Sequence, residues 1–328
     1  MRLAICAALL LSACQCREDA SPEDRHDDAR VRRPIDAAWP TVSFCGQTIA
    51  CGELLARDSI PSIDCHDPHT SDLGPLRPLA ACPTPLLMIN LRDSGVTDLS
   101  ALRDLHAIEL VNLDGTAVRD LGPLSKQPLK DLSAERDTAL TDIALLAAIP
   151  TLESLGLSET GIRDLKPLAT LRSLKWLDID HTAVQDLSPL AGSPSLTSLV
   201  ASRTRVTDLA PLAKLAKLQL LILDGTEVVD LSPLASDVAL ENLRIRYMPV
   251  TDLRPIVDLP QLKHLSIDGT AIADFSPLHA HSWIDVEYYD TPPSAPPCDV
   301  LERQIRVHCA RWHKTPREFA KFYDGYRE

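Results

Sequence analysis

The sequence contains few aromatic residues and few glycines. Of its 328 residues only 13 are Phe, Trp or Tyr and only 12 are Gly, whereas 53 are Leu. The low glycine content excludes collagen and other glycine-rich repeats. The high aliphatic content excludes a disordered chain, because that much apolar surface would collapse in water. Such an excess of leucine over aromatic residues indicates a repeated structure.

Long hydrophobic runs and excess positive charge are also missing. No stretch approaches the roughly 18 apolar residues of a membrane-spanning helix, which excludes a multi-span membrane protein. The net charge is −13, and because binding to phosphates requires a positive face we expect no nucleic acid partner. The sequence lacks Gly-x-Ser-x-Gly, His-Glu-x-x-His, Gly-x-Gly-x-x-Gly and the phosphate-binding loop. We therefore expect a protein that is not an enzyme, with no cofactor and no bound metal.

The N-terminus has the form of a secretion signal. A basic Arg2 precedes an apolar run, which ends at the tetrapeptide Leu11-Ser12-Ala13-Cys14. This tetrapeptide resembles the bacterial lipobox, which implies cleavage of residues 1–13 and palmitate or a related lipid on Cys14. Gln15 is not the Asp that marks inner-membrane retention, so we expect an envelope protein anchored to the outer membrane. The alternative is an ordinary secretion signal that happens to contain cysteines.

The cysteines lie near the two ends of the mature chain, and export favours disulfides. Pairing by proximity predicts Cys45 with Cys51, Cys65 with Cys82, and Cys298 with Cys309, although six cysteines allow 15 connectivities. An alternative is a zinc site formed by Cys65, Cys82 and the histidines between them. The charged residues 14–43, which precede these cysteines, are predicted to form a flexible tether.

An aspartate recurs every 22 residues without exception, and seven of the nine copies are followed three residues later by Pro. The nine positions are Asp98, Asp120, Asp142, Asp164, Asp186, Asp208, Asp230, Asp252 and Asp274. The consensus L-x-x-L-x-L-x-x-T-x-V-x-D-L-x-P-L-x-x-L-x-x is that of a leucine-rich repeat.

One unit shows how the repeat is expected to fold. Leu177 and Ile179 alternate with polar residues, so a short strand turns them inward and turns Trp176 outward. Asp186 before a Pro-containing turn is expected to cap a short helix or 3-10 turn. Because one unit cannot bury its leucines alone, neighbouring units must stack. The fold class is therefore an α/β solenoid, a right-handed superhelix with parallel strands on the concave face and helical turns on the convex face.

The repeat resembles the 22-residue leucine-rich repeat of bacterial internalins over residues 86–291. This resemblance implies the solenoid fold, and the invasion-type function of internalins is not carried over with it. The turn position that usually holds Asn carries Ser, Met or, most often, Thr here, for example Thr182, whose hydroxyl can also bond backbone groups. Residues 44–85 are predicted to form an N-terminal cap, and residues 292–328 a Pro-rich linker and C-terminal cap, each with its own disulfides. A half-repeat is predicted at 72–76 and a last strand at 283–289. The third unit is one residue out of phase near Ala134, which predicts a bulge or bend.

The outward strand positions vary, and this variation is expected where a face suits a partner. The predicted partner-binding residues are Trp176, Asp178, Asp180, Leu220, Ile222, Asp224, Arg244, Arg246, His264 and Tyr289. We expect a monomer that binds a protein of unknown identity. Two alternatives are a structural envelope lipoprotein and a binder of carbohydrate or cell wall. The aspartate column is predicted to cap turns, with calcium binding as the alternative.

Overall fold

The structure is a computed structural model that describes residues 40–51, 62–82, 86–105, 107–280 and 284–287. The chain divides into two compact units, residues 1–38 and 39–328, and every described residue belongs to the second. The predicted signal 1–13, most of the tether 14–43, and the segment 292–328 with Cys298 and Cys309 lie outside the described residues. Within the described ranges, no helix is both long and apolar enough to cross a membrane.

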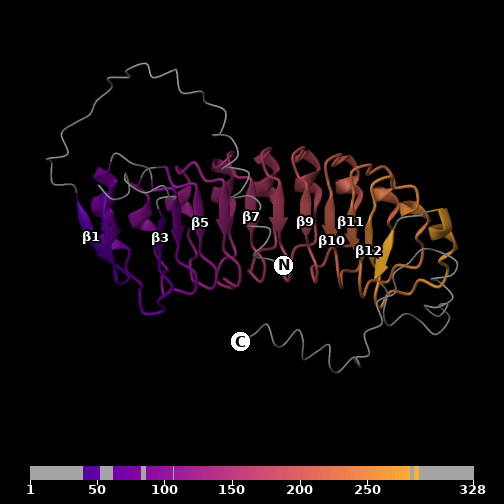
Figure 1. Ribbon diagram of the computed structural model, residues 1–328, viewed down its shortest axis with the longest axis horizontal. Coiled ribbons are helices and arrows are strands. Elements are labelled where there is room, and N and C mark those ends of the chain that lie inside the picture. The colour runs from indigo at the N-terminus through magenta and orange to yellow at the C-terminus, as the bar shows by residue number, and fades with distance from the viewer. Residues whose placement is uncertain (1–39, 52–61, 83–85, 106, 281–283, 288–328) are drawn as a thin grey trace, which may run out of the picture. The chain divides into compact units, whose positions relative to one another are not determined.

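An eleven-stranded parallel sheet forms the body of the fold, with its strands side by side in chain order (Figure 1). Successive strands pair without any change of direction, as a solenoid of stacked repeats requires. The strands are β3 (Ser62–Asp64), β4 (Met88–Asn90), β5 (Leu110–Asn112), β6 (Asp131–Ser133), β7 (Ser154–Gly156), β8 (Trp176–Asp178), β9 (Ser198–Val200), β10 (Leu220–Ile222), β11 (Asn242–Arg244), β12 (His264–Ser266) and β13 (Asp285–Glu287). The predicted leucine-rich repeat fold is confirmed.

Each strand buries its middle residue and turns the other two away from the core. Leu177, Leu199 and Leu221 are the middle residues of β8, β9 and β10; they pair in register and are fully buried. Burial of one such side chain stabilises the fold by about 1.5 to 3 kcal/mol. The core is thus one continuous stack of aliphatic side chains, in which every repeat covers the next.

A 3-10 helix follows each strand from β3 to β12 on the other side of the core. These helices are η1 (Gly74–Ala81), η2 (Ser100–Leu102), η3 (Gly122–Leu124), η4 (Ala144–Ala148), η5 (Lys166–Thr170), η6 (Ser188–Gly192), η7 (Ala210–Lys214), η8 (Ser232–Leu234), η9 (Arg254–Ile256) and η10 (Ser276–Ala280).

The aspartate column caps these 3-10 helices, as predicted. In all nine copies Oδ1 accepts a hydrogen bond from the backbone N–H two residues later, at 2.7 to 2.9 Å. The aspartate precedes the N-cap residue, which is the following Leu or its equivalent, for example Leu187 after Asp186. The backbone hydrogen bond from Ser188 lowers the pKa of Asp186 below its ordinary value. The column is therefore explained by the repeat itself.

Buried hydroxyls close the turn after five of the described strands. Thr160 and Thr182 each donate to the carbonyl oxygen three residues earlier, at 2.6 and 2.7 Å. In the irregular third repeat Asp137 takes this position and accepts a hydrogen bond from the Ala139 backbone N–H, and burial raises its pKa. β6 pairs with both neighbours in unbroken register, so the strand carries no bulge. The extra residue is accommodated by a second turn at residues 138–139.

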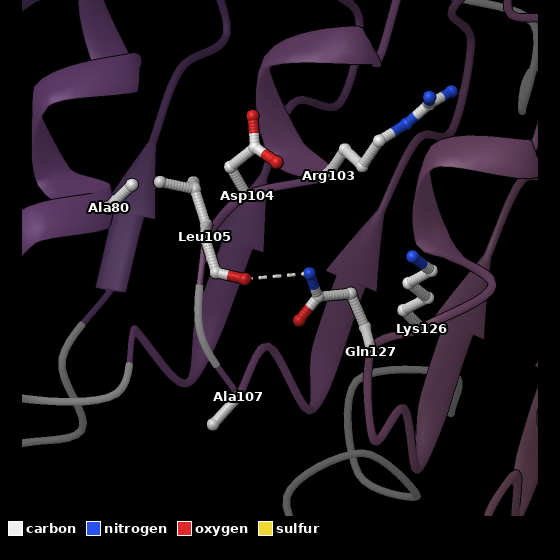
Figure 2. A pocket seen from close by; sticks show the side chains of 7 residues that line it. All are labelled: Ala80, Arg103, Asp104, Leu105, Ala107, Lys126 and Gln127. Carbon is white, nitrogen blue, oxygen red and sulfur yellow. Dashed lines mark hydrogen bonds between the residues drawn. The ribbon is translucent and has the colours of Figure 1, made fainter.

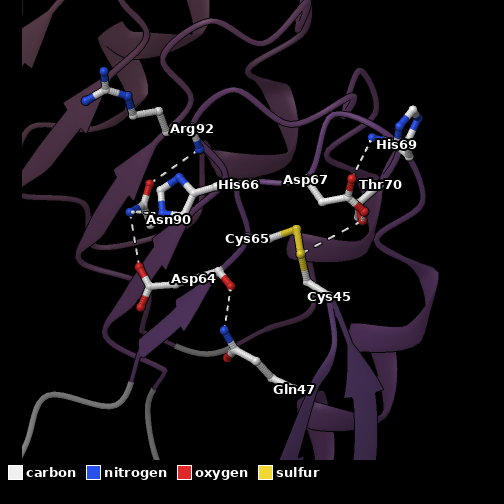
Figure 3. The surroundings of a disulfide bond; sticks show 10 residues. All are labelled: Cys45, Gln47, Asp64, Cys65, His66, Asp67, His69, Thr70, Asn90 and Arg92. Carbon is white, nitrogen blue, oxygen red and sulfur yellow. Dashed lines mark hydrogen bonds between the residues drawn. A yellow bond between two sulfur atoms is a disulfide. The ribbon is translucent and has the colours of Figure 1, made fainter.

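The N-terminal cap is an antiparallel hairpin of β1 (Thr41–Phe44) and β2 (Gln47–Ala50), which begins within the range predicted as tether. Cys45 and Gly46 both have positive φ, as a type I′ hairpin turn requires. The Gln47 side-chain amide donates to the Asp64 carbonyl oxygen at 2.8 Å, which connects the hairpin to β3 (Figure 3).

Two disulfides hold this cap, and their connectivity differs from the prediction. Cys45 pairs with Cys65, and Cys51 pairs with Cys82. Cys45 and Cys51 flank β2 at opposite ends, about 20 Å apart along an extended chain, whereas a disulfide requires Cα atoms within about 7 Å. The predicted pairs Cys45–Cys51 and Cys65–Cys82 are therefore wrong. Because both thiols of the alternative zinc site are oxidised to disulfides, they cannot bind zinc as thiolates.

The solenoid starts one repeat earlier than predicted. β3 joins the sheet, and Asp72 caps η1 by accepting a hydrogen bond from the Gly74 backbone N–H at 2.7 Å. The sequence indicated only a half-repeat here, because Ile63 and its partner Ile89 are 26 residues apart and Cys65 takes the second inward position, which is aliphatic in the other units. At the other end β13 confirms part of the predicted last strand.

Polar side chains replace aliphatic ones at one buried position after the 3-10 helices. Gln127 donates to the carbonyl oxygens of Leu102 and Leu105 and accepts from the Ile108 N–H. Figure 2 shows the hydrogen bond to Leu105. It therefore joins two repeats at the base of a shallow hollow of about 490 Å³. Asp237 occupies the equivalent position in a later repeat and is 5% exposed; its Oδ1 accepts from the Ala239 N–H at 3.2 Å.

The disulfide connectivity can be tested by freeing one thiol. In Cys45→Ser we expect iodoacetamide, applied to the unfolded and unreduced protein, to label Cys65, as peptide mass spectrometry would show. Loss of this disulfide should also lower the free energy of unfolding by about 2 to 4 kcal/mol. Cys51→Ser is the matched control and should expose Cys82. Labelling of Cys51 in the Cys45→Ser variant would contradict the structure.

Asp237 predicts a pH dependence of stability. Burial raises its pKa to about 6, from 3.8 in the unfolded chain. Its contribution to stability is therefore fully present below pH 4 and is lost as pH rises through 6. Asp237→Asn keeps the acceptor oxygen without the charge, and it should raise the unfolding free energy at pH 7.5 by about 1 kcal/mol, after allowance for solvent screening.

Urea unfolding at pH 7.5 and pH 4 measures this effect, and the gain should vanish at the lower pH. Asp230→Asn, in the same repeat, is the control. Hydrogen bonds from the side chain and backbone of Ser232 lower the pKa of Asp230, so this variant should show no gain at pH 7.5. An equal gain for Asp237→Asn at both pH values would contradict the assignment.

Candidate binding face

The outward side chains of β3 to β13, together with the side chain of the second residue after each strand, form a surface that we call the sheet face. Each repeat contributes the first and third strand residues and the second residue after the strand, such as Trp176, Asp178 and Asp180. Backbone hydrogen bonds keep these positions aligned beyond the strands, for example from the Glu159 N–H to the Asp180 carbonyl. The sheet face is therefore a regular grid of side chains on a rigid support.

An apolar patch lies on β8, β9 and β10. Trp176 and Leu220 flank Ser198 in the first row, while Val200 and Ile222 are adjacent in the next row. All four apolar side chains are half-buried. The structure thus brings together the predicted anchors Trp176, Leu220 and Ile222, and it adds Val200, which the prediction omitted. Tyr289, the remaining predicted aromatic residue, lies outside the described residues, as does the lipidation candidate Cys14.

The rest of the sheet face is acidic. Among the residues of this face whose side chains the structure describes, three arginines stand against nine carboxylates, a balance of −6. The arginines are Arg92, Arg244 and Arg246, and the carboxylates are Asp64, Asp114, Asp131, Glu135, Asp178, Asp180, Asp224, Asp268 and Asp285. Such a face attracts cationic partners and repels anionic ones.

Asp224 fixes the two predicted arginines in place. Its Oδ2 lies 2.7 Å from Arg244 Nη2 and 2.6 Å from Arg246 Nη2, and its Oδ1 accepts the Arg246 backbone N–H. Burial raises the pKa of Asp224 more than the neighbouring Arg246 lowers it. Asp224 is therefore a positioning residue for the arginines, and Arg244, the more exposed of the two, offers the guanidinium that a partner can contact.

Asp178 and Asp180, also predicted to contact a partner, are largely buried, with 4% and 9% exposure. The Asp180 backbone N–H donates to Asp178 Oδ1 at 2.9 Å, and Asp180 Oδ2 lies 3.0 Å from His181 Nδ1. These contacts hold the acids within the turn. His264 is exposed, with Nδ1 3.7 Å from an Asp285 carboxylate oxygen.

Asp131 on β6 is an acid that the sequence did not single out. Burial raises its pKa above the ordinary value, and the charge of nearby Asp114 adds to this effect, while a hydrogen bond from Ser154 opposes it. All three outward residues of β7 and its turn, Ser154, Gly156 and Ser158, are small and buried beneath their neighbours. The face is therefore closely packed at β7, unlike the patch on β8 to β10.

One edge of the sheet face carries a row of residues with positive φ. In six repeats these are not glycine: Asp93, Arg136, Glu159, His181, Arg203 and Tyr247. The row continues with Gly115, Gly225 and Gly269. We call it the edge row. The sequence indicates this position only through its three glycines, which share one place in the 22-residue period.

Two glycines of the edge row combine positive φ with close contacts from neighbouring side chains. A Cβ on Gly115 would meet Asp93 and Arg136, whose ion pair at 2.9 Å passes over this residue. A Cβ on Gly269 would collide with the ring of Tyr247. Hydrogen bonds from Arg92 and Arg136 lower the pKa of Asp93, although burial opposes them. The edge row thus carries exposed polar and aromatic groups, with the ion pair of Asp93 and Arg136 passing over Gly115.

In the described parts of the chain, no three His, Cys, Asp or Glu side chains are arranged to hold a metal ion. The column aspartates, considered above as calcium ligands, are engaged by backbone N–H groups of their own turns.

No family model and no curated protein matches the sequence. Solved structures do match. An internalin (inlF) from Listeria monocytogenes has a TM-score of 0.69 at 24% identity, covering 79% of this chain and 75% of its own. Internalin C2 from the same species has a TM-score of 0.50 at 27% identity, with 69% and 87% covered.

A plant peptide hormone receptor, RGFR1 in complex with RGF2, has a TM-score of 0.55 at 12% identity, over 66% of this chain and 37% of the receptor. These likenesses agree with the stacked parallel strands described above. The chain therefore has the leucine-rich repeat fold, in the form shared with bacterial internalins.

Proposed function

We propose that the protein binds a protein partner through the sheet face. The observation that carries this proposal is the apolar patch of Trp176, Val200, Leu220 and Ile222. It lies on a rigid sheet and is flanked by Arg244 and by acidic side chains. A central apolar cluster with a charged surround is the usual composition of a protein interface.

The repeat separates the fold from the binding chemistry. Inward positions are aliphatic in repeat after repeat, while the residues of the sheet face change from strand to strand. Because the buried stack alone holds the strands in register, the outward residues are free to suit a partner. Proteins with the same fold support this function in general terms, since RGFR1 was solved in complex with RGF2.

The proposed activity is binding without catalysis. The polar groups of the face have structural roles: Ser133 donates to Asp114, and Asp178 accepts a backbone N–H. Asp180 and His181 are close to each other, but Arg203 occupies the other ring nitrogen of the histidine at 3.0 Å. A general base would need that nitrogen for its substrate.

We also propose that the protein is a monomer anchored by lipid at Cys14 in a bacterial envelope, on the outer membrane. The apolar run that ends in Leu-Ser-Ala-Cys and the charged residues 14–43 support an anchor followed by a tether. The tether would hold the sheet face away from the lipid surface.

The binding proposal predicts the effect of a charge in the apolar patch. Ile222→Asp should lower capture of partner proteins from envelope extracts at least tenfold, because burying the new carboxylate costs more than one ordinary apolar contact gains. Quantitative mass spectrometry of proteins retained by the immobilised variant and wild type measures this. Val238→Asp is the control, since Val238 is 59% exposed and lies after η8, away from the patch.

Thermal unfolding followed by circular dichroism should show that both variants fold. Equal capture by Ile222→Asp and wild type would overturn the assignment of the patch. Retention of glycans without proteins would instead favour the carbohydrate-binding alternative.

The anchor predicts a labelling result that does not depend on any partner. Radiolabelled palmitate fed to expressing bacteria should enter the wild-type protein and be absent from Cys14→Ser. Cys16→Ser is the matched control and should label normally, because only the cysteine at the cleavage site receives lipid. Labelling of Cys14→Ser would exclude the proposed anchor.

A further inference from the structure

The aromatic residues that the repeats lack are concentrated at the end of the chain. Five of the 13 aromatic residues fall within residues 312–326: Trp312, Phe319, Phe322, Tyr323 and Tyr326. The last four follow the i, i+3, i+4, i+7 spacing of one helix face. We propose that residues 312–326 dock on the apolar patch of the same chain and cover it.

Charge supports this pairing. Residues 301–328 carry seven Lys or Arg and four Asp or Glu, a balance of +3. On β8 to β11 the sheet face carries Asp178, Asp180 and Asp224 against Arg244 and Arg246, a balance of −1, and the described face as a whole has a balance of −6. A segment that combines aromatic side chains with basic ones therefore matches both the apolar patch and its acidic surroundings. Its aromatic face would contact Leu220 and Ile222, while its net positive charge suits the net negative charge of the sheet face.

The length of the segment between β13 and the aromatic residues also allows this docking. The sheet ends at β13, and the apolar patch lies on the third to fifth strands before it, about 14 to 24 Å away at 4.8 Å per strand. Residues 288–311 connect β13 to the aromatic segment, and 24 residues can span up to about 80 Å. A connection this short gives an effective concentration in the millimolar range, so even weak contacts would keep the patch covered.

Docking of this segment would compete with the partner of the proposed function. The partner would have to displace it, and its apparent affinity would fall by the fraction of molecules in which the patch is covered. This regulatory consequence rests on the proposed function, whereas the docking itself does not.

Photo-cross-linking of the full-length chain tests the docking. A benzoylphenylalanine in place of Leu220 should, on irradiation, form intramolecular cross-links to residues 312–326, identified by peptide mass spectrometry. The control places the same probe at Val238, which is exposed on the other side of the repeat and should give no such cross-link. In the double variant Phe319→Ser and Phe322→Ser, the yield from the Leu220 probe should fall at least fivefold.

A mixture of isotopically light and heavy protein distinguishes the occupants. Cross-links between light and heavy chains would show a second copy on the patch and overturn the proposal, as would cross-links to other segments or none at all. The test uses purified protein without a partner. Its failure would therefore leave the capture experiment unaffected, and failure of that experiment would leave the docking intact.

Discussion

The in-register stacking of buried aliphatic side chains is the interaction on which the rest of the structure depends. Each three-residue strand exposes too little backbone to pair stably by itself, and each repeat buries its leucines only against its neighbours. The middle residues Leu177, Leu199 and Leu221 show the arrangement, since each is fully buried between the equivalent residues of adjacent repeats. Because this stack determines the register, the residues of the sheet face can change without altering the strands that carry them.

The period of the sequence was sufficient to predict the fold. Constant spacing of the aspartates determined the repeat length, and alternation around Leu177 determined which residues face inward. The boundaries and the disulfides could not be obtained in this way. The unit of β3 is 26 residues long and has Cys65 at its second inward position, and Cys45 reaches Cys65 only because a hairpin turns back toward the sheet. Both depend on contacts between segments that have no period.

The candidate site was predictable in position and less so in chemistry. Outward alternation correctly placed Trp176, Leu220 and Ile222 on one surface, since alternation depends only on the strand. It could not indicate that Asp224 would be buried between two arginines, because hydrogen bonds between repeats depend on which side chains become neighbours. The sequence shows that a residue points outward, whereas the structure shows whether its side chain is already hydrogen-bonded to a neighbouring repeat.

The edge row shows how a repeat protein can acquire chemical variety at a conformational cost. A glycine would satisfy the positive φ of each turn without strain, yet Glu159, His181, Arg203 and Tyr247 adopt it as well. A side chain in the left-handed region costs roughly 1 to 2 kcal/mol. A chain whose repeats are otherwise nearly identical therefore retains several local strains along one edge of its most variable surface. The stability of the buried stack offsets this strain, so different side chains can stand at the same position of successive repeats.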